Sequence, residues 1–109
     1  MAVNYKVLGQ SAPIATTLTD VYTVPVDTQA IVSTISICTR STSTAIRIAV
    51  RPNGATIDDK HYIVHDVTIE VYEAMFLTVG LSLSAGDVIS VYNEVADASF
   101  SVFGSEIVA

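Results

Sequence analysis

The sequence predicts an all-β protein, a single antiparallel β-sandwich of the jelly-roll type with about eight strands. The first indication is composition: Val, Ile and Thr supply 39 of the 109 residues and Leu only 5, and β-branched side chains fit a pleated sheet better than a helix. The second is the period-two alternation of apolar and polar side chains, as over residues 88–95. The third is the regular occurrence of turn residues such as Pro52-Asn53-Gly54 between these segments.

Four strands are expected in the first half of the chain. Each segment alternates in polarity and ends at residues that favour turns, such as Pro25 after the second segment and Ser41-Thr42-Ser43 after the third. These expected strands are Val3–Leu8, Leu18–Val24, Ala30–Arg40 and Ile46–Val50.

The third segment is the longest, and strict alternation assigns its side chains to two faces. One face would carry Ile31, Ser33, Ile35 and Ile37, and the other Val32, Thr34, Ser36 and Cys38. Because both sets contain apolar side chains, we expect both faces to be at least partly covered.

The second half of the chain supplies the remaining strands, and no segment has a sustained helical period. The final segment places Phe100 and Val102 on an apolar face and serines on the opposite one. The expected strands here are His61–Asp66, a further short one at Ile69–Tyr72, Met75–Gly80, Val88–Val95 and Ser99–Ser105.

Length and cysteine content bound the organisation of the chain. A length of 109 residues fits one domain, residues 1–109, in which residues 1–13 could act as an arm during assembly. The single Cys38 cannot form an internal disulfide and is expected to be a small buried core residue. The start of the chain lacks the apolar run of a signal peptide, and no stretch reaches the roughly 20 apolar residues of a membrane span.

Charge is distributed unevenly along the chain. Residues 1–60 hold all five Lys and Arg residues against four acids, whereas residues 61–109 hold seven acids and no Lys or Arg. Nucleic-acid binding requires clustered cations that neutralise phosphates, so this composition argues against it. Arg47 and Arg51 lie four residues apart on one strand face, with Arg40 the nearest other cation. They are interpreted as a solvated face or one side of a protein contact.

The segment from Asp58 to Asp66 contains the only pattern that suggests metal chemistry. His61 and His65 are four residues apart, which on a strand places them roughly 13 Å from each other, too far to share one ion without ligands from other strands. Asp58-Asp59 lacks the alternating oxygen ligands of a calcium loop. Nucleophile elbows and phosphate loops are also missing from the sequence. We therefore expect no metal, no cofactor and no enzymatic activity.

Several segments together resemble small β-sandwich virion proteins of tailed bacteriophages, including those of cyanobacteria. The resemblance extends over nearly the whole chain, and a weaker one links Leu83–Asp87 and Ser99–Phe103 to trimeric jelly rolls of the tumour-necrosis-factor and complement type. The residues that carry the phage resemblance are Asn4–Ser11, Leu18–Pro25, Ile46–Val50, Lys60–Ile63 and Phe103–Glu106.

The phage resemblance implies a structural protein made in the host cytoplasm and incorporated into the virion. The expected role is capsid decoration, in which a cement protein binds the major capsid protein and stabilises the assembled head, without nucleic-acid or membrane partners. The alternative is a neck, tail or fibre component that binds a host receptor or glycan. Its aromatic side chains would be expected in loops, whereas those of this chain fall mostly in strands.

The structural role leads to two expectations about contact residues. Capsid surfaces have local threefold positions, so a homotrimer is expected. Its subunit contact would use Val88, Tyr92, Phe100 and Val102. An acidic capsid surface would be contacted by Arg40, Arg47 and Arg51, because a guanidinium can pair with both oxygens of a carboxylate.

Overall fold

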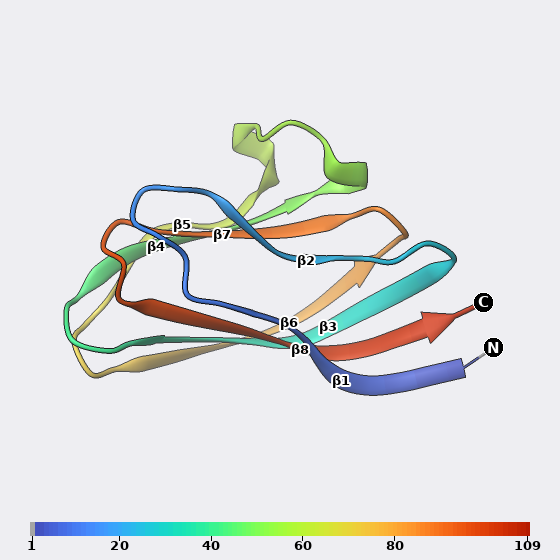
Figure 1. Cartoon of the computed structure of the whole chain (residues 1–109), viewed down its shortest axis with the longest axis horizontal. Helices are drawn as coiled ribbons and strands as arrows, with labels where there is room; N and C mark the ends of the chain where they lie inside the picture. Colours follow the sequence, from blue (N-terminus) through green and yellow to red (C-terminus); the bar gives the residue numbers. More distant parts are fainter. Residues whose placement is uncertain (1) are drawn as a thin grey trace.

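Two four-stranded antiparallel sheets pack face to face in the computed structural model, which describes residues 2–109 (Figure 1). One sheet has the strand order β1-β8-β3-β6 and the other the order β2-β7-β4-β5. The strands are β1 (Ala2–Ser11), β2 (Thr19–Thr23), β3 (Thr28–Thr39), β4 (Thr44–Arg51), β5 (Tyr62–Ile69), β6 (Ala74–Leu83), β7 (Val88–Asn93) and β8 (Ala98–Val108).

The strand pairing is that of a jelly roll. Strand β1 pairs with β8, β2 with β7, β3 with β6 and β4 with β5, as in one long antiparallel ribbon that is folded over on itself. Because β8 also pairs with β3 and β7 with β4, the folded ribbon closes into two sheets. The predicted fold class, an antiparallel sandwich with eight strands, is confirmed.

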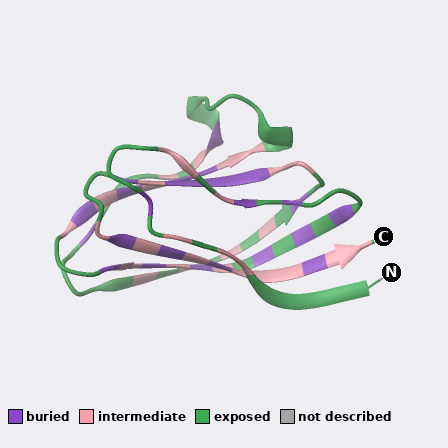
Figure 2. Cartoon of the chain, viewed as in Figure 1, coloured by how far each residue is buried: buried purple, intermediate pink, exposed green. Residues whose placement is uncertain are grey.

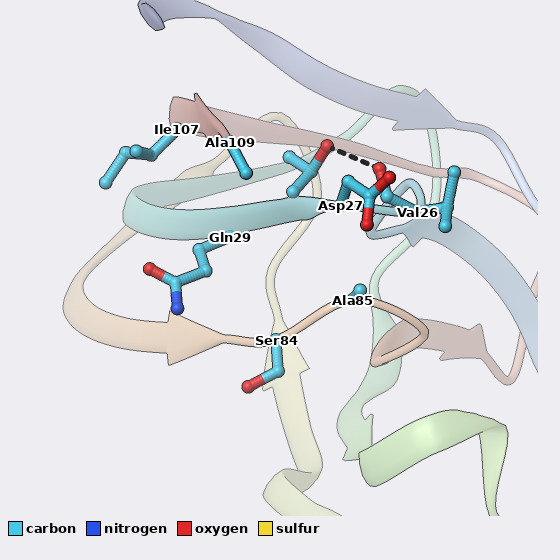
Figure 3. A pocket seen from close by; sticks show the side chains of 8 residues that line it. Val26, Asp27, Gln29, Ser84, Ala85, Ile107 and Ala109 are labelled. Carbon is cyan, nitrogen blue, oxygen red and sulfur yellow. Dashed lines mark hydrogen bonds between the residues drawn. The ribbon is translucent and has the colours of Figure 1, made fainter. Parts of the chain in front are cut away.

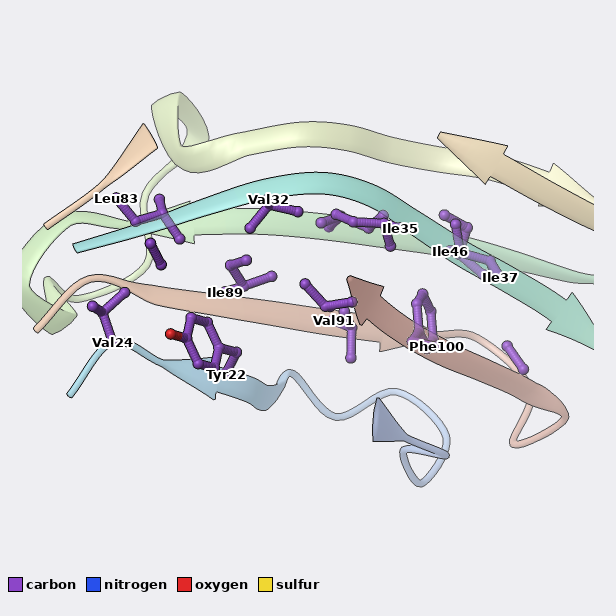
Figure 4. Packing of buried hydrophobic residues seen from close by; sticks show 14 of the residues in the cluster. Tyr22, Val24, Val32, Ile35, Ile37, Ile46, Leu83, Ile89, Val91 and Phe100 are labelled. Atoms are coloured by element: carbon purple, nitrogen blue, oxygen red, sulfur yellow. The ribbon is translucent and has the colours of Figure 1, made fainter. Parts of the chain in front are cut away.

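The core lies between the two sheets and is built mainly from Ile and Val side chains (Figure 4). The alternation is visible along the strands, and β3 shows buried and exposed residues in turn (Figure 2). Strand β7 contributes Ile89 and Val91, and β8 contributes Phe100 and Val102 from the opposite sheet. Burial of these side chains is the main stabilising contribution to the fold.

A β-bulge at Ser33 reverses the faces of β3. Between Val32 and Thr34, β3 has one extra residue relative to β8, and β6 has one extra residue relative to β3. Gly104 lies opposite Val32, and a Cβ atom there would collide with the carbonyl oxygen of Ile31. The strict alternation expected along 30–40 is therefore wrong across this point: Val32 is buried with Ile35 and Ile37, whereas Ile31 is exposed.

The connection between β4 and β5 differs from the expected pattern. Residues 52–61 contain two short 3₁₀ turns, Pro52–Gly54 and Asp59–His61, and they lie over the outer side of the β2-β7-β4-β5 sheet (Figure 1). The two short strands expected at 61–66 and 69–72 are instead one strand, β5, whose register with β4 shifts twice. Asp66 has a positive φ of 56° and lies between Val64 and Val67, two residues that pair with β4. The register is irregular at this point, so side chains of β5 do not alternate strictly between the two faces.

The first strand is an edge strand. Residues 2–11, expected to belong to an arm, pair with β8 throughout, and both chain ends lie at the same end of the sandwich (Figure 1).

No helix among residues 2–109 has the length and apolar character needed to cross a membrane.

Candidate functional site

The outer face of the β1-β8-β3-β6 sheet, called here the neutral face, is left uncovered by the other segments among residues 2–109 (Figure 1). Side chains of β8 alternate between the core, as for Phe100 and Val102, and this face, as for Phe103. The pairing registers of β1, β3 and β6 show which of their side chains share this face. The neutral face consists of Val3, Tyr5, Val7, Gln10, Gln29, Ile31, Thr34, Ser36, Cys38, Ala74, Phe76, Thr78, Gly80, Ser82, Ser99, Ser101, Phe103, Ser105 and Ile107.

Charged side chains are absent from the neutral face within the described part of the chain. The four strands that form it contain two charged residues, Lys6 and Glu106, and both have the register of core-facing positions. Most soluble protein surfaces mix both signs of charge, and contact surfaces are depleted of charge at their centre. The neutral face therefore has the composition of a protein contact surface.

Glu106 connects both sheets from beneath the neutral face. Its Oε1 accepts a hydrogen bond from Lys6 Nζ at 2.9 Å, and its Oε2 accepts one from Tyr22 Oη at 2.6 Å. The Tyr22 and Lys6 hydrogen bonds hold the pKa of the Glu106 carboxyl below its usual value. Burial, followed by the adjacent carboxylate, raises the pKa of the Tyr22 phenol. The two charged residues of this sheet, Lys6 and Glu106, thus stabilise the fold through contacts on its core-facing side.

Two aromatic side chains protrude from opposite edges of the neutral face. Tyr5 on β1 is 85% exposed and Phe76 on β6 is 70% exposed. The sequence identified neither residue as a contact. The pairing register places Tyr5 in a row with Ser105, Ile31 and Ser82 across the sheet, and Phe76 in a row with Ser36, Ser101 and Gln10.

Each of these two rows contains a hollow at the edge opposite its aromatic side chain. One hollow begins at Ile31 and Ser82, across the sheet from Tyr5, and extends toward the chain termini, to Gln29, Ser84 and Ile107. The other is lined by Gln10, Ser99 and Ser101, across the sheet from Phe76. The neutral face thus has a protruding ring and a hollow at the two ends of each row.

A third hollow, of about 500 Å³, opens at the end of the sandwich that carries the chain termini (Figure 3). Apolar side chains from three segments line it, including Val26, Ala85 and Ile107, with Asp27 and Gln29 at its side. Its lining contains no aromatic ring, so it offers no stacking surface for a sugar.

The outer face of the other sheet, called here the paired-charge face, is cross-linked by its own side chains. Arg47 on β4 lies 2.6 Å from Asp66 on β5 through its Nε, and its guanidinium carbon lies 4.5 Å above the ring centre of Tyr92 on β7. The Arg47 guanidinium holds the pKa of Asp66 below its usual value. This pairing joins three strands of the sheet.

Arg51 forms a second cross-link on the paired-charge face. Its Nη2 donates to Asp20 Oδ1 at 2.8 Å, and its Nε donates to Ser90 Oγ at 3.1 Å. Its Nη1 donates to the carbonyl oxygens of Gly54 and Ala55, which fixes the β4–β5 connection against the sheet. Arg51 therefore has internal partners for all of its guanidinium nitrogens.

The third expected capsid contact, Arg40, also has partners within the chain. Its Nη2 donates to the carbonyl oxygen of Ala96 at 2.9 Å and its Nε to that of Asp97 at 3.2 Å. The three arginines proposed to contact an acidic shell thus support the turns and strands of this chain, which reduces their capacity to pair with an external carboxylate.

The four residues expected at a subunit contact lie inside the fold or beneath other side chains. Phe100 and Val102 are buried in the core between the sheets. Val88 is buried close to Gly54 of the β4–β5 connection, and Tyr92 lies under Arg47. Phe100 and Val102 are therefore not accessible to a subunit contact in the folded chain, since the apolar face of the last strand packs in the chain's own core.

Cys38 and the two histidines are also placed differently from the expectation. Cys38 lies on the neutral face, partly exposed, opposite Ser99 and Ala74, because the bulge at Ser33 moves it out of the core set. His61 is buried, and its Nδ1 accepts a hydrogen bond from the Asp58 backbone N–H at 3.0 Å. His65 is exposed beside Asp66. Within residues 2–109, no three His, Cys, Asp or Glu side chains are grouped as metal ligands.

Comparison of the chain with protein-family models, with curated proteins and with solved structures finds no match.

Proposed function

We propose that this protein is a structural protein of a tailed-bacteriophage particle, acting as a capsid decoration protein that binds the major capsid protein and stabilises the head. The supporting observation from the structure is the neutral face. A broad surface without charge, with Tyr5 and Phe76 exposed on it, is typical of a surface that associates with another protein. The assignment to a tailed-bacteriophage particle rests on the resemblance of the sequence to phage virion proteins.

The location of the exposed aromatic rings favours assembly over recognition of a glycan. Tyr5 and Phe76 lie within strands at the edges of a sheet, and Tyr72 is the exposed aromatic residue of a turn. A neck, tail or fibre role remains the alternative proposal, and the hollow beside the termini is the feature that would accept part of a host receptor. Binding of the receptor there would perturb Val26 and Ile107 first.

Immunogold electron microscopy of purified phage particles tests this proposal. The protein should copurify with the particles and label the head surface at many points. Heads from which the protein has been removed should release their DNA at a lower temperature than complete heads. Label at the neck, tail or fibres would support the alternative role, and protein that stays free in the lysate would contradict both.

A further inference from the structure

We infer that the neutral face is occupied by a second copy of this chain, related to the first by a twofold axis that runs parallel to the strands. This inference rests on the part of the proposed function that makes the neutral face an assembly surface, and it assigns that surface to contact between copies, so that the dimer would bind the capsid protein through another surface. The residues that carry it are the two protruding rings, Tyr5 and Phe76, and the hollow that lies across the sheet from each.

The positions of rings and hollows match under a single rotation. A 180° rotation about an axis parallel to the strands, placed between two facing sheets, exchanges the β1 edge with the β6 edge and keeps each row at its own height. Tyr5 of one copy then meets the hollow at Ile31 and Ser82 of the other. The same rotation brings Phe76 to the hollow at Gln10 and Ser101. One operation satisfies both contacts, as an isologous interface requires.

The area of the face reaches the lower end of the range for a specific dimer. Four strands about 4.8 Å apart and about ten residues long cover about 19 Å by about 33 Å, or about 600 Å² before the relief of the side chains is counted. Specific interfaces bury about 1,200–2,000 Å² in total, or about 600–1,000 Å² on each partner. Sheets pack face to face at about 10 Å with nearly aligned strands, and the twofold axis gives this alignment directly.

The charges of the chain also favour a second copy. Each copy has a net charge of −6, so a charged residue at the centre of the contact would add to the repulsion between copies, and the neutral face has none among the residues described. Because the remaining repulsion is screened by ions, added salt should strengthen the dimer. A cationic partner would show the opposite dependence. The proposed dimer also differs from the homotrimer expected from the sequence, and the oligomeric mass distinguishes them.

A short bifunctional thiol cross-linker tests the geometry most sharply. In a Cys38→Ser background, Tyr5→Cys with Ser82→Cys places two thiols on strands three positions apart in one sheet. They are about 14 Å apart within one copy, beyond the reach of a bis-maleimide that spans about 8 Å. Across the twofold axis they face each other on sheets about 10 Å apart, so this reagent should give a covalent dimer of twice 11.6 kDa.

The matched control is Tyr5→Cys with Phe76→Cys, which keeps the same two strands but moves the second thiol about 20 Å along β6. It should remain monomeric with the same cross-linker. Equal cross-linking of both pairs, or of neither, would overturn the twofold contact.

Sedimentation equilibrium of the unmodified chain provides a readout that requires no engineered thiol. The protein should sediment as a dimer at micromolar concentration. Tyr5→Lys should weaken association about tenfold or more, whereas Tyr72→Lys, the same change at an equally exposed tyrosine outside the neutral face, should leave it unchanged. A monomer or a trimer under these conditions would refute the inference, while the particle location of the proposed function would still stand or fall by microscopy.

Discussion

The two outer faces of this sandwich use charge in opposite ways. The paired-charge face carries Arg47 and Arg51, each bonded to an aspartate on a different strand, and the β4–β5 connection lies over part of it. Within residues 2–109, the neutral face carries no charge and is covered by no other segment, while the charged residues of its strands, Lys6 and Glu106, bond to each other. Cross-linked charge stabilises one chain, whereas a bare uncharged sheet is suited to contact with another.

The largest difference in the free energy of unfolding is expected between substitutions of a core-facing and an outward-facing phenylalanine of β8. Phe100→Ala removes a buried ring from the core and should lower the free energy of unfolding by about 3–5 kcal/mol. Phe103→Ala, three residues along the same strand on the neutral face, should cost much less in the monomer and should instead weaken association. Urea denaturation of the two variants, with sedimentation of each, measures both quantities. Equal loss of stability would show that Phe103 is also a core residue.

A substitution at Glu106 measures how much this inward-facing carboxylate contributes to the stability of the fold. Glu106→Gln should lower the free energy of unfolding by about 1.5–3 kcal/mol at neutral pH, because charge-assisted bonds to Tyr22 and Lys6 are lost.

The pH dependence of this effect has a definite sign. The folded pKa of Glu106 lies below its ordinary value of 4.5, so its stabilisation is present above that value and is lost as pH falls through the folded pKa. The difference in stability between wild type and Glu106→Gln should therefore shrink below about pH 4.5. A difference that stays constant under acid conditions would show that the carboxylate is not stabilised by these bonds.

The arginines of the paired-charge face should affect folding more than attachment. Arg51→Ala removes bonds to Asp20, Ser90 and the β4–β5 connection and should cost about 1–2 kcal/mol. Arg47→Ala should cost less, because the Arg47 side chain is more exposed than that of Arg51, 28% against 16%, and has fewer hydrogen-bond partners. Thermal unfolding orders the two variants. If a folded double variant lost particle binding without losing stability, these arginines would contact the capsid as the sequence first suggested.

The smallest effect is expected at Cys38. Since this thiol is partly exposed on the neutral face, Cys38→Ser should change the free energy of unfolding by less than about 1 kcal/mol. Unmodified protein should react with a thiol reagent faster when it is dilute and dissociated than when it is concentrated. A thiol that never reacts without denaturant would place Cys38 in the core after all.

Local alternation was sufficient to predict most strands but not the sides of every strand. The alternation expected along Val88–Asn93 and Ala98–Val108 matches the structure, because neither strand contains an extra residue that would exchange its two faces. At Ser33 one extra residue reverses the parity of β3, and nothing in the run Val32-Ser33-Thr34 marks the bulge. Its partner Gly104 was the available signal, since a glycine within a strand often permits close approach of another backbone.

The neutral face could be recognised only after the strands were assigned to sheets. The sequence shows that the segments containing Tyr5, Ile31, Phe76 and Phe103 are poor in charge. That they lie side by side depends on long-range pairing of β1 with β8 and of β3 with β6, which the local pattern does not specify. The same limit explains the contact expected at Phe100 and Val102, where an apolar side was correctly found but the core already occupied it.

Hydroxyl-radical labelling of tyrosines tests most directly whether the neutral face is covered in the assembled protein. In the single chain Tyr5 is 85% exposed and Tyr72 is 80% exposed, so the two should react alike when the protein is dilute. On assembly, Tyr5 and Phe76, which lies at the opposite edge of the same face, should become protected while Tyr72 stays reactive. Equal reactivity of Tyr5 and Tyr72 at every concentration, and in any particle that contains the protein, would contradict the assignment of this face as a contact surface.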